Sequence, residues 1–258
     1  MSREPGNAEE STDKEMPFLE HLIELRSRIL RSLALVALLF IPIYYYAEPL
    51  FTFVSAPLTQ ALPDGSSMIA TQVTTPFLTP FKLAIYTAIF VGVPFLLHQL
   101  WGFVSPGLYR SEKRFAFPLL FSSVVLFYAG MAFSYFLVFP LVFSFFVAVS
   151  PEGVQMMTDI NQYLDFVLKM FLAFGIAFEI PVATFLLAWS GLSTADSMAN
   201  KRPYVIIGCF VVGMLLTPPD VVSQLLLALP TWLLFEFGIL MARFVEKRGA
   251  VEKNQQDS

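Results

Sequence analysis

Residues 115–149 read FAFPLLFSSVVLFYAGMAFSYFLVFPLVFSFFVAV, a run of 35 residues without a charge. An α-helix rises about 1.5 Å per residue, so this run would form a helix about 50 Å long. The hydrocarbon core of a bilayer is only about 30 Å thick, and about 20 apolar residues cross it. The run therefore predicts a transmembrane helix that is tilted, projects beyond the membrane and bends near Pro140.

Further apolar runs follow the same pattern in a chain that is 56% hydrophobic and only 14% charged. A soluble domain carries about 25% charged residues. We therefore predict an all-α polytopic membrane protein with six transmembrane helices, contained in residues 17–244. The last two spans form a hairpin around the turn Thr217–Asp220. The approximate spans are residues 29–46, 83–101, 115–149, 166–189, 204–217 and 221–241.

The basic residues predict which side of the membrane each loop occupies. Fourteen of the 16 Lys and Arg residues lie in residues 3–31, 110–114, 201–202 and 243–253, while the loops 47–76, 150–163 and 218–220 contain none. Cytoplasmic loops carry the excess of Lys and Arg, so both termini are predicted to be cytoplasmic. The acidic N-terminal residues 1–16 and the C-terminal residues 249–258 are interpreted as disordered tails.

Several classes of function lack the residues they need. The single cysteine, Cys209, excludes an internal disulfide and a multi-cysteine metal site. The chain has no phosphate-binding glycine loop, no His-Glu-x-x-His motif and no basic domain for nucleic acid. We therefore expect no cofactor, no metal and no ATP hydrolysis by this chain. Two alternatives stay open: an intramembrane hydrolase using His98, and an ion-coupled secondary transporter of a small solute using Glu179 and Lys169.

Two glutamates on the predicted cytoplasmic face are candidates for binding a cationic ligand. Glu24 precedes Arg28 by four residues, which favours an ion pair within one helix. Glu112 follows Ser111 at the start of the third span, where a carboxylate suits the helix dipole. Either residue can instead be an open acidic site at the membrane surface. Together, two such carboxylates would suit two guanidinium groups, each bound bidentately.

Polar residues within the spans are a second group of candidates. Glu179 lies near the middle of the membrane, where an ionisable group is costly. It is either a neutral acid bonded to a neighbouring helix or a group that faces a hydrated groove. Met214, Thr217 and Gln224 lie in the outer half of the hairpin. Either Thr217 caps its own turn and Gln224 faces the interface, or these residues bond to another helix.

The outer segment 47–76 is the longest one without basic residues. Prolines interrupt it at positions 49, 57, 63 and 76, which predicts a short helix and turns that cover the spans. Lys82 follows this segment at the start of the second span. Its long side chain is expected to reach the outer surface.

Six segments, in order along the six-span plan, resemble the TatC family, the receptor subunit of the twin-arginine protein translocase. The resemblance covers essentially Pro17–Phe244, and its last two segments are the most specific. The segments are His-Leu-Ile-Glu-Leu-Arg at 21–26, Ser-Ala-Pro-Leu at 55–58, Pro-Gly-Leu-Tyr-Arg-Ser-Glu-Lys-Arg at 106–114, Phe-Glu-Ile-Pro-Val at 178–182, Lys-Arg-Pro-Tyr-Val at 201–205 and Gly-Met-Leu-Leu-Thr-Pro-Pro-Asp-Val at 213–221.

The resemblance implies a cupped six-helix bundle in the bacterial inner membrane, without enzymatic activity, that works with the proton motive force. It implies a multimeric complex with the single-span subunits TatA and TatB, and twin-arginine signal peptides of folded cargo as ligands. It also implies three groups of functional residues. These are Glu24, Arg26, Phe103 and Glu112 for the signal peptide, Met214, Thr217 and Gln224 for partner docking, and Pro57, Phe77 and Asp220 for the periplasmic cap and turn.

Overall fold

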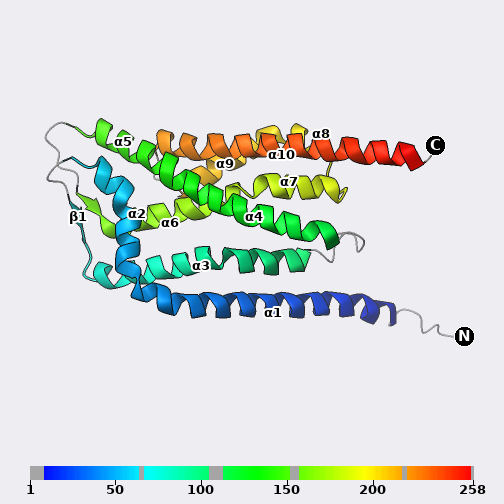
Figure 1. Ribbon diagram of the computed structural model, residues 1–258, viewed down its shortest axis with the longest axis horizontal. Coiled ribbons are helices and arrows are strands. Elements are labelled where there is room, and N and C mark those ends of the chain that lie inside the picture. The colour runs from blue at the N-terminus through cyan, green and yellow to red at the C-terminus, as the bar shows by residue number, and fades with distance from the viewer. Residues whose placement is uncertain (1–8, 64–66, 105–112, 152–156, 217–219, 257–258) are drawn as a thin grey trace, which may run out of the picture.

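In the computed structural model, long helices lie side by side, and a shorter helix crosses one end of the bundle (Figure 1). The structure describes residues 9–63, 67–104, 113–151, 157–216 and 220–256. Two short strands are present, β1 (Met68–Ile69) and β2 (Thr158–Asp159). The α-helices are α1 (Glu9–Tyr45), α2 (Ala47–Ala61), α3 (Thr75–Val104), α4 (Lys113–Phe133), α5 (Phe139–Val149), α6 (Ile160–Ala177), α7 (Ile180–Trp189), α8 (Ala195–Asn200), α9 (Arg202–Leu216) and α10 (Val221–Gln256).

The two ends of the bundle differ in what they carry. The first described turn of α1 and the last of α10 lie at the same end, which we call the terminal end (Figure 1). The opposite end carries α2 and β1, and we call it the α2 end. An even number of membrane crossings accounts for two termini on one side.

Five helical stretches are long and apolar enough to cross a membrane: residues 21–45, 75–103, 117–149, 160–189 and 221–247. The apolar helix α9 is shorter, at 15 residues. It covers about 22 Å, which is less than a typical hydrocarbon core. These six segments are the six predicted spans, and the prediction that the fifth is short is confirmed.

The third span is irregular at the predicted place. A π-helical segment, Ser134–Val138, joins α4 to α5 and ends two residues before Pro140. Proline has no N–H to donate to the preceding turn, and a single wide turn is a common way to accommodate such a local mismatch. The long apolar run is therefore one span with a defect, as its proline suggested.

The fourth span differs from the prediction of one helix over residues 166–189. It consists of α6 and α7, which are separated at Phe178 and Glu179. The N–H of Glu179 bonds to the Ile176 carbonyl at 3.0 Å, three residues back in place of four. Pro181 lacks an N–H for the Ala177 carbonyl and restricts the residue before it, which explains the break.

Parts of both predicted tails are helical in the structure. The helix α1 already begins at Glu9, and α10 continues to Gln256. Residues 9–16 and 249–256, which we expected to be disordered, are therefore helical, while residues 1–8 and 257–258 lie outside the described residues. Glu and Lys are good helix formers, so a polar stretch that adjoins a long helix can extend it.

Aromatic side chains from α3, α4, α5 and α6 form the main core. Phe90, Phe127, Phe139, Phe171 and Phe174 are all buried there. A smaller cluster, centred on Phe235 and Ile239 of α10, packs against α7 and α8 towards the terminal end.

Two features at opposite ends were not foreseen. The strands β1 and β2 pair in parallel at the α2 end, with Met68 opposite Thr158 and Ile69 opposite Asp159. The short helix α8, capped by the Thr194 hydroxyl, precedes α9. Elements of two to six residues are too short to show a hydrophobic period, so an all-α prediction misses the strands.

Candidate functional site

The Glu24 carboxylate and the Arg28 guanidinium form an ion pair on α1, towards the terminal end. Arg28 donates from Nε at 2.9 Å and from Nη2 at 2.5 Å to Oε1 of Glu24. Its third nitrogen, Nη1, donates to the backbone carbonyl of Gln99 at 3.3 Å and to the Gln99 side-chain oxygen at 3.4 Å. The pair that the four-residue spacing favours is therefore formed, and it also ties α1 to α3.

The packing of α3 against α1 shapes the space around this pair. A Cβ atom at Gly102 would overlap Nη1 of Arg28, so the guanidinium lies directly against the α3 backbone. One residue further, the ring of Phe103 stacks on His21 with centroids 4.2 Å apart. Glu24, Gln99 and Gly102 thus surround one guanidinium group, and the stacked rings of His21 and Phe103 lie on the same two helices.

The other residues predicted for this site are less well placed. Arg26 is exposed on α1 and makes no ion pair within the described part of the chain. Glu112 lies outside the described residues, so its position relative to Glu24 stays a prediction. Gln99 and Gly102 were not singled out from the sequence, because neither residue type marks a guanidinium site by itself.

Glu179 stands at the break between α6 and α7. Its Oε1 atom is buried and has no hydrogen-bond partner among the described residues, and the same holds for the hydroxyl of its buried neighbour Ser123 on α4. Lys169 is exposed and forms no ion pair within the described ranges. The Ser123 hydroxyl is therefore a neighbour of the Glu179 carboxyl without bonding to its Oε1, and no ion pair joins Glu179 to Lys169 within the described ranges.

The residues predicted for partner docking in the hairpin of α9 and α10 have different surroundings. Gln224 donates from Nε2 to the Phe210 carbonyl at 2.8 Å, which joins the two helices. Met214 is 58% exposed on the outer surface of α9. Asp220 caps α10 by accepting from the Ser223 N–H at 2.7 Å. Thr217 lies outside the described residues.

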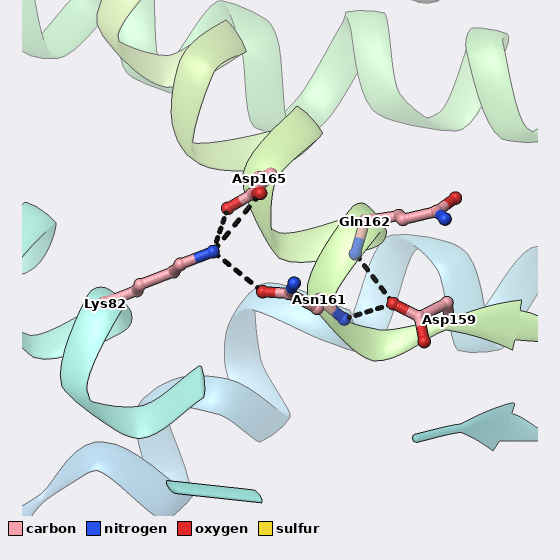
Figure 2. Close-up of polar contacts among 5 residues, drawn as sticks. All are labelled: Lys82, Asp159, Asn161, Gln162 and Asp165. Carbon is pink, nitrogen blue, oxygen red and sulfur yellow. Dashed lines mark hydrogen bonds and ion pairs between the residues drawn. The ribbon is translucent and has the colours of Figure 1, made fainter. Parts of the chain in front are cut away.

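A polar cluster fastens α3 and the β1 region to α6 at the α2 end, as Figure 2 shows in part. Lys82 donates to Asp165 at 2.9 Å and to the Asn161 side-chain oxygen at 2.8 Å. Asp159 accepts from the N–H groups of Asn161 and Gln162, which caps α6. The Lys82 side chain, which we expected to reach the outer surface, is 33% exposed and is held by Asp165, the sixth residue of α6.

Asp159 also connects this cap to the segment after β1. Its Oδ2 accepts from the Thr71 hydroxyl at 2.5 Å and from the Thr71 N–H at 3.1 Å. The Thr71 hydroxyl and then the Gln162 N–H hold the pKa of Asp159 below its ordinary value. Of the residues predicted for the cap, Pro57 is buried within α2, and Phe77 is exposed on α3.

A second interhelical ion pair lies towards the terminal end. Arg202 of α9 binds Glu236 of α10 through Nε at 2.5 Å and through Nη2 at 2.8 Å. The sequence carries a signal for this pair that we did not use: Glu236 is an acidic residue inside a predicted span, and it needs a nearby cation.

The family model described as Sec-independent protein translocase protein (TatC) matches residues 20–230. The chain belongs to the TatC family. The TatC of Azotobacter chroococcum mcd 1 is 59% identical over 241 residues, covering 93% of this chain and 94% of that protein. The TatC of Haemophilus influenzae is 52% identical, and the match covers 95% of this chain and 97% of that protein. The TatC of Escherichia coli K12 is 50% identical, and the match covers 93% of this chain and 93% of that protein.

A solved structure supports the same fold. The crystal structure of a twin-arginine translocase receptor, TatC, superposes with a TM-score of 0.81 at 33% identity and covers 88% of this chain and 99% of that one. The six-helix membrane fold predicted from the sequence is therefore confirmed, and the chain is a component of the twin-arginine protein translocase. The alternative of a small-solute transporter has no support in these similarities.

Proposed function

We propose that this TatC protein binds the arginine pair of twin-arginine signal peptides with Glu24 and Glu112, at the cytoplasmic face of the bacterial inner membrane. The observation that carries the proposal is the guanidinium already bound at Glu24. That carboxylate holds Arg28 between α1 and α3, while 37% of the Glu24 side chain remains exposed. A site that fits one guanidinium group has the right chemistry for another.

Binding of a peptide arginine would work by exchange. A free carboxylate oxygen can accept from a second guanidinium, and an incoming arginine can replace Arg28 at Oε1. Gln99 offers two further acceptors, its backbone carbonyl and its side-chain oxygen, to whichever guanidinium occupies this position. Phe103 and Arg26 would flank the bound segment, as the family resemblance implies.

Titration with a labelled signal peptide tests this site in purified protein. A charge-assisted hydrogen bond contributes about 1.5–3 kcal/mol, so Glu24→Gln and Glu112→Gln should each weaken binding by about tenfold or more. A peptide with two lysines should also bind less well, because lysine lacks the planar fork. Glu48→Gln, which removes an exposed carboxylate at the α2 end, is the matched control. Unchanged affinity in both single variants would refute the assignment.

We also propose that the hairpin of α9 and α10 docks the single-span subunits TatA and TatB in a multimeric complex. The exposed Met214 and the short α9 support this, because a polar or thin segment in a bilayer favours association with other helices. Thr217 is assigned to the same contact. Cysteines at positions 214 and 224 should crosslink to a partner span. Cysteines at the exposed Val91 of α3 and Phe117 of α4 serve as comparison, and strong crosslinks only there would move the contact elsewhere.

The remaining parts of the proposal follow from the family and the sequence. The proton motive force is the energy source, in keeping with a sequence that lacks a nucleotide-binding loop. The protein has no enzymatic activity of its own. The terminal end faces the cytoplasm, where the basic stretches lie. A cysteine introduced near residue 250 should react with an impermeant thiol reagent only after the inner membrane is opened, and reaction in sealed spheroplasts would reverse this orientation.

A further inference from the structure

A recess of about 280 Å³ lies at the α2 end, between α2, α3 and the first residue of α6. Most of its lining is apolar and includes Ala47, Phe51 and Ile160. No residue that we assigned to signal-peptide binding or partner docking lines it. Its volume is near the lower end of the range for small-ligand pockets in proteins.

Two hydroxyl groups in the wall of this recess have no partner. Thr75 and Thr79 are 2% and 6% exposed, and neither hydroxyl makes a hydrogen bond among the described residues. They are four residues apart, so both lie on one face of α3. A buried hydroxyl without a partner is unfavourable, and native structures normally satisfy it with a protein group, an ordered water or a bound molecule. The pair therefore points to an occupant that accepts hydrogen bonds.

Two prolines lie in the first turns of α3, and Pro80 interrupts the backbone hydrogen bonding there. Pro76 and Pro80 both line the recess. Pro80 has no N–H to donate to the Pro76 carbonyl, and proline weakens the regular bonding of a helix turn. The first turns of α3 thus place two buried hydroxyls beside an apolar proline surface.

The walls of the recess are held in place independently of any occupant. Asp159 caps α6 immediately before Ile160 and binds Thr71, so the lining residue from α6 is fixed. Lys82, one turn beyond Thr79, binds Asp165 and Asn161 and joins α3 to α6 (Figure 2). A cavity between elements fastened in this way is formed before a ligand enters it.

The recess opens where the membrane surface is expected. Tyr44, Tyr45 and Tyr46 are exposed at the end of α1, and such aromatic groups gather at the level of the lipid head groups. The exposed Phe77, on the first turn of α3, stacks on Phe81. An opening at this depth meets phospholipids before any other abundant molecule.

The rim adds a charge that selects among phospholipids. Glu48, exposed at the start of α2, lies beside the opening and forms no ion pair within the described ranges. A carboxylate there attracts an ammonium head group and repels a purely anionic one.

We propose that the recess binds one phosphatidylethanolamine molecule from the leaflet at the α2 end. An acyl chain lies against the apolar wall, an ester carbonyl accepts from the hydroxyls of Thr75 and Thr79, and the ammonium group lies near Glu48. The bound lipid completes the hydrogen bonding of α3 and seals the junction between α2 and the spans.

Photolabelling with a lipid probe tests the proposal. The full-length protein is reconstituted in vesicles of phosphatidylethanolamine and phosphatidylglycerol that contain a trace of phosphatidylethanolamine with a diazirine on one acyl chain. After irradiation, adducts should concentrate on peptides from residues 47–51 and 70–80. In the double variant Thr75→Val and Thr79→Val they should fall about tenfold, because two hydrogen bonds are lost. Thr59→Val is the control, since that hydroxyl is exposed on α2 and bonds to backbone carbonyls.

Further variants keep the proposal open to refutation if the double variant fails to fold. Ala70→Phe fills the recess from its exposed rim and should remove the local adducts. Glu48→Gln should reduce the preference for the phosphatidylethanolamine probe over a phosphatidylglycerol probe. Adducts spread evenly over the lipid-facing helices, or unaffected by Ala70→Phe, would overturn the site. A partner subunit that crosslinks to Ala70→Cys with no lipid adduct there would overturn the choice of occupant.

Discussion

The substitution Gly130→Ala should destabilise the protein by about 2 kcal/mol. Gly130 is buried on α4, and a Cβ atom there would overlap the backbone carbonyl oxygen of Phe174 on α6 and lie 2.8 Å from its carbon. Overpacking costs about 1–3 kcal/mol, and the upper end applies because a helix backbone cannot rotate away as a side chain can. The higher helix propensity of alanine offsets about 1 kcal/mol of this.

The assay is thermal unfolding of the purified protein in detergent, with Gly208→Ala as the matched control. Gly208 is exposed on α9, and a Cβ atom there meets nothing within 4 Å. Gly130→Ala should lower the apparent Tm by about 4–8 °C, on the scale of 2–4 °C per kcal/mol for a chain of this size. Gly208→Ala should leave it unchanged or slightly raise it. Equal stability of the two variants would refute the view that α4 and α6 touch through Gly130.

Three further outcomes are expected. Glu179→Gln should insert and fold but reduce export of a twin-arginine reporter, and normal export would argue against a role for that carboxyl. Folding lowers the pKa of Asp159, so its carboxylate stabilises the fold at pH values above its unfolded pKa. This stabilisation is lost as the pH falls through the pKa of the folded state. Acid should therefore lower the Tm of the wild type more than that of Asp159→Asn. Gln224→Leu should keep the bundle folded, since one interhelical hydrogen bond contributes about 0.6 kcal/mol. The same substitution should weaken crosslinks to TatA or TatB. Undiminished crosslinks would contradict the docking surface.

The candidate site was only partly predictable from the sequence. The spacing of Glu24 and Arg28 places both on one helix face, and the ion pair follows from that local geometry. The contact of Arg28 with Gln99 does not follow, because it joins residues 71 positions apart. The same distinction holds at the α2 end, where Lys82 finds Asp165 across 83 positions. Spacing along one helix is fixed by its repeat, whereas pairing between helices depends on how they pack.

The class of the protein, its spans and the segments that resemble one family can all be predicted from the sequence. Apolar runs must cross a bilayer as helices, since every backbone group there needs a partner within its own segment. Which residues of different helices meet depends on the packing of the whole bundle. The approach of α4 to α6 at Gly130 and the recess behind Thr75 arise where helices pack against one another. Such contacts depend on the shapes of both helix surfaces, and the residue pattern of one helix does not indicate which helix packs against it.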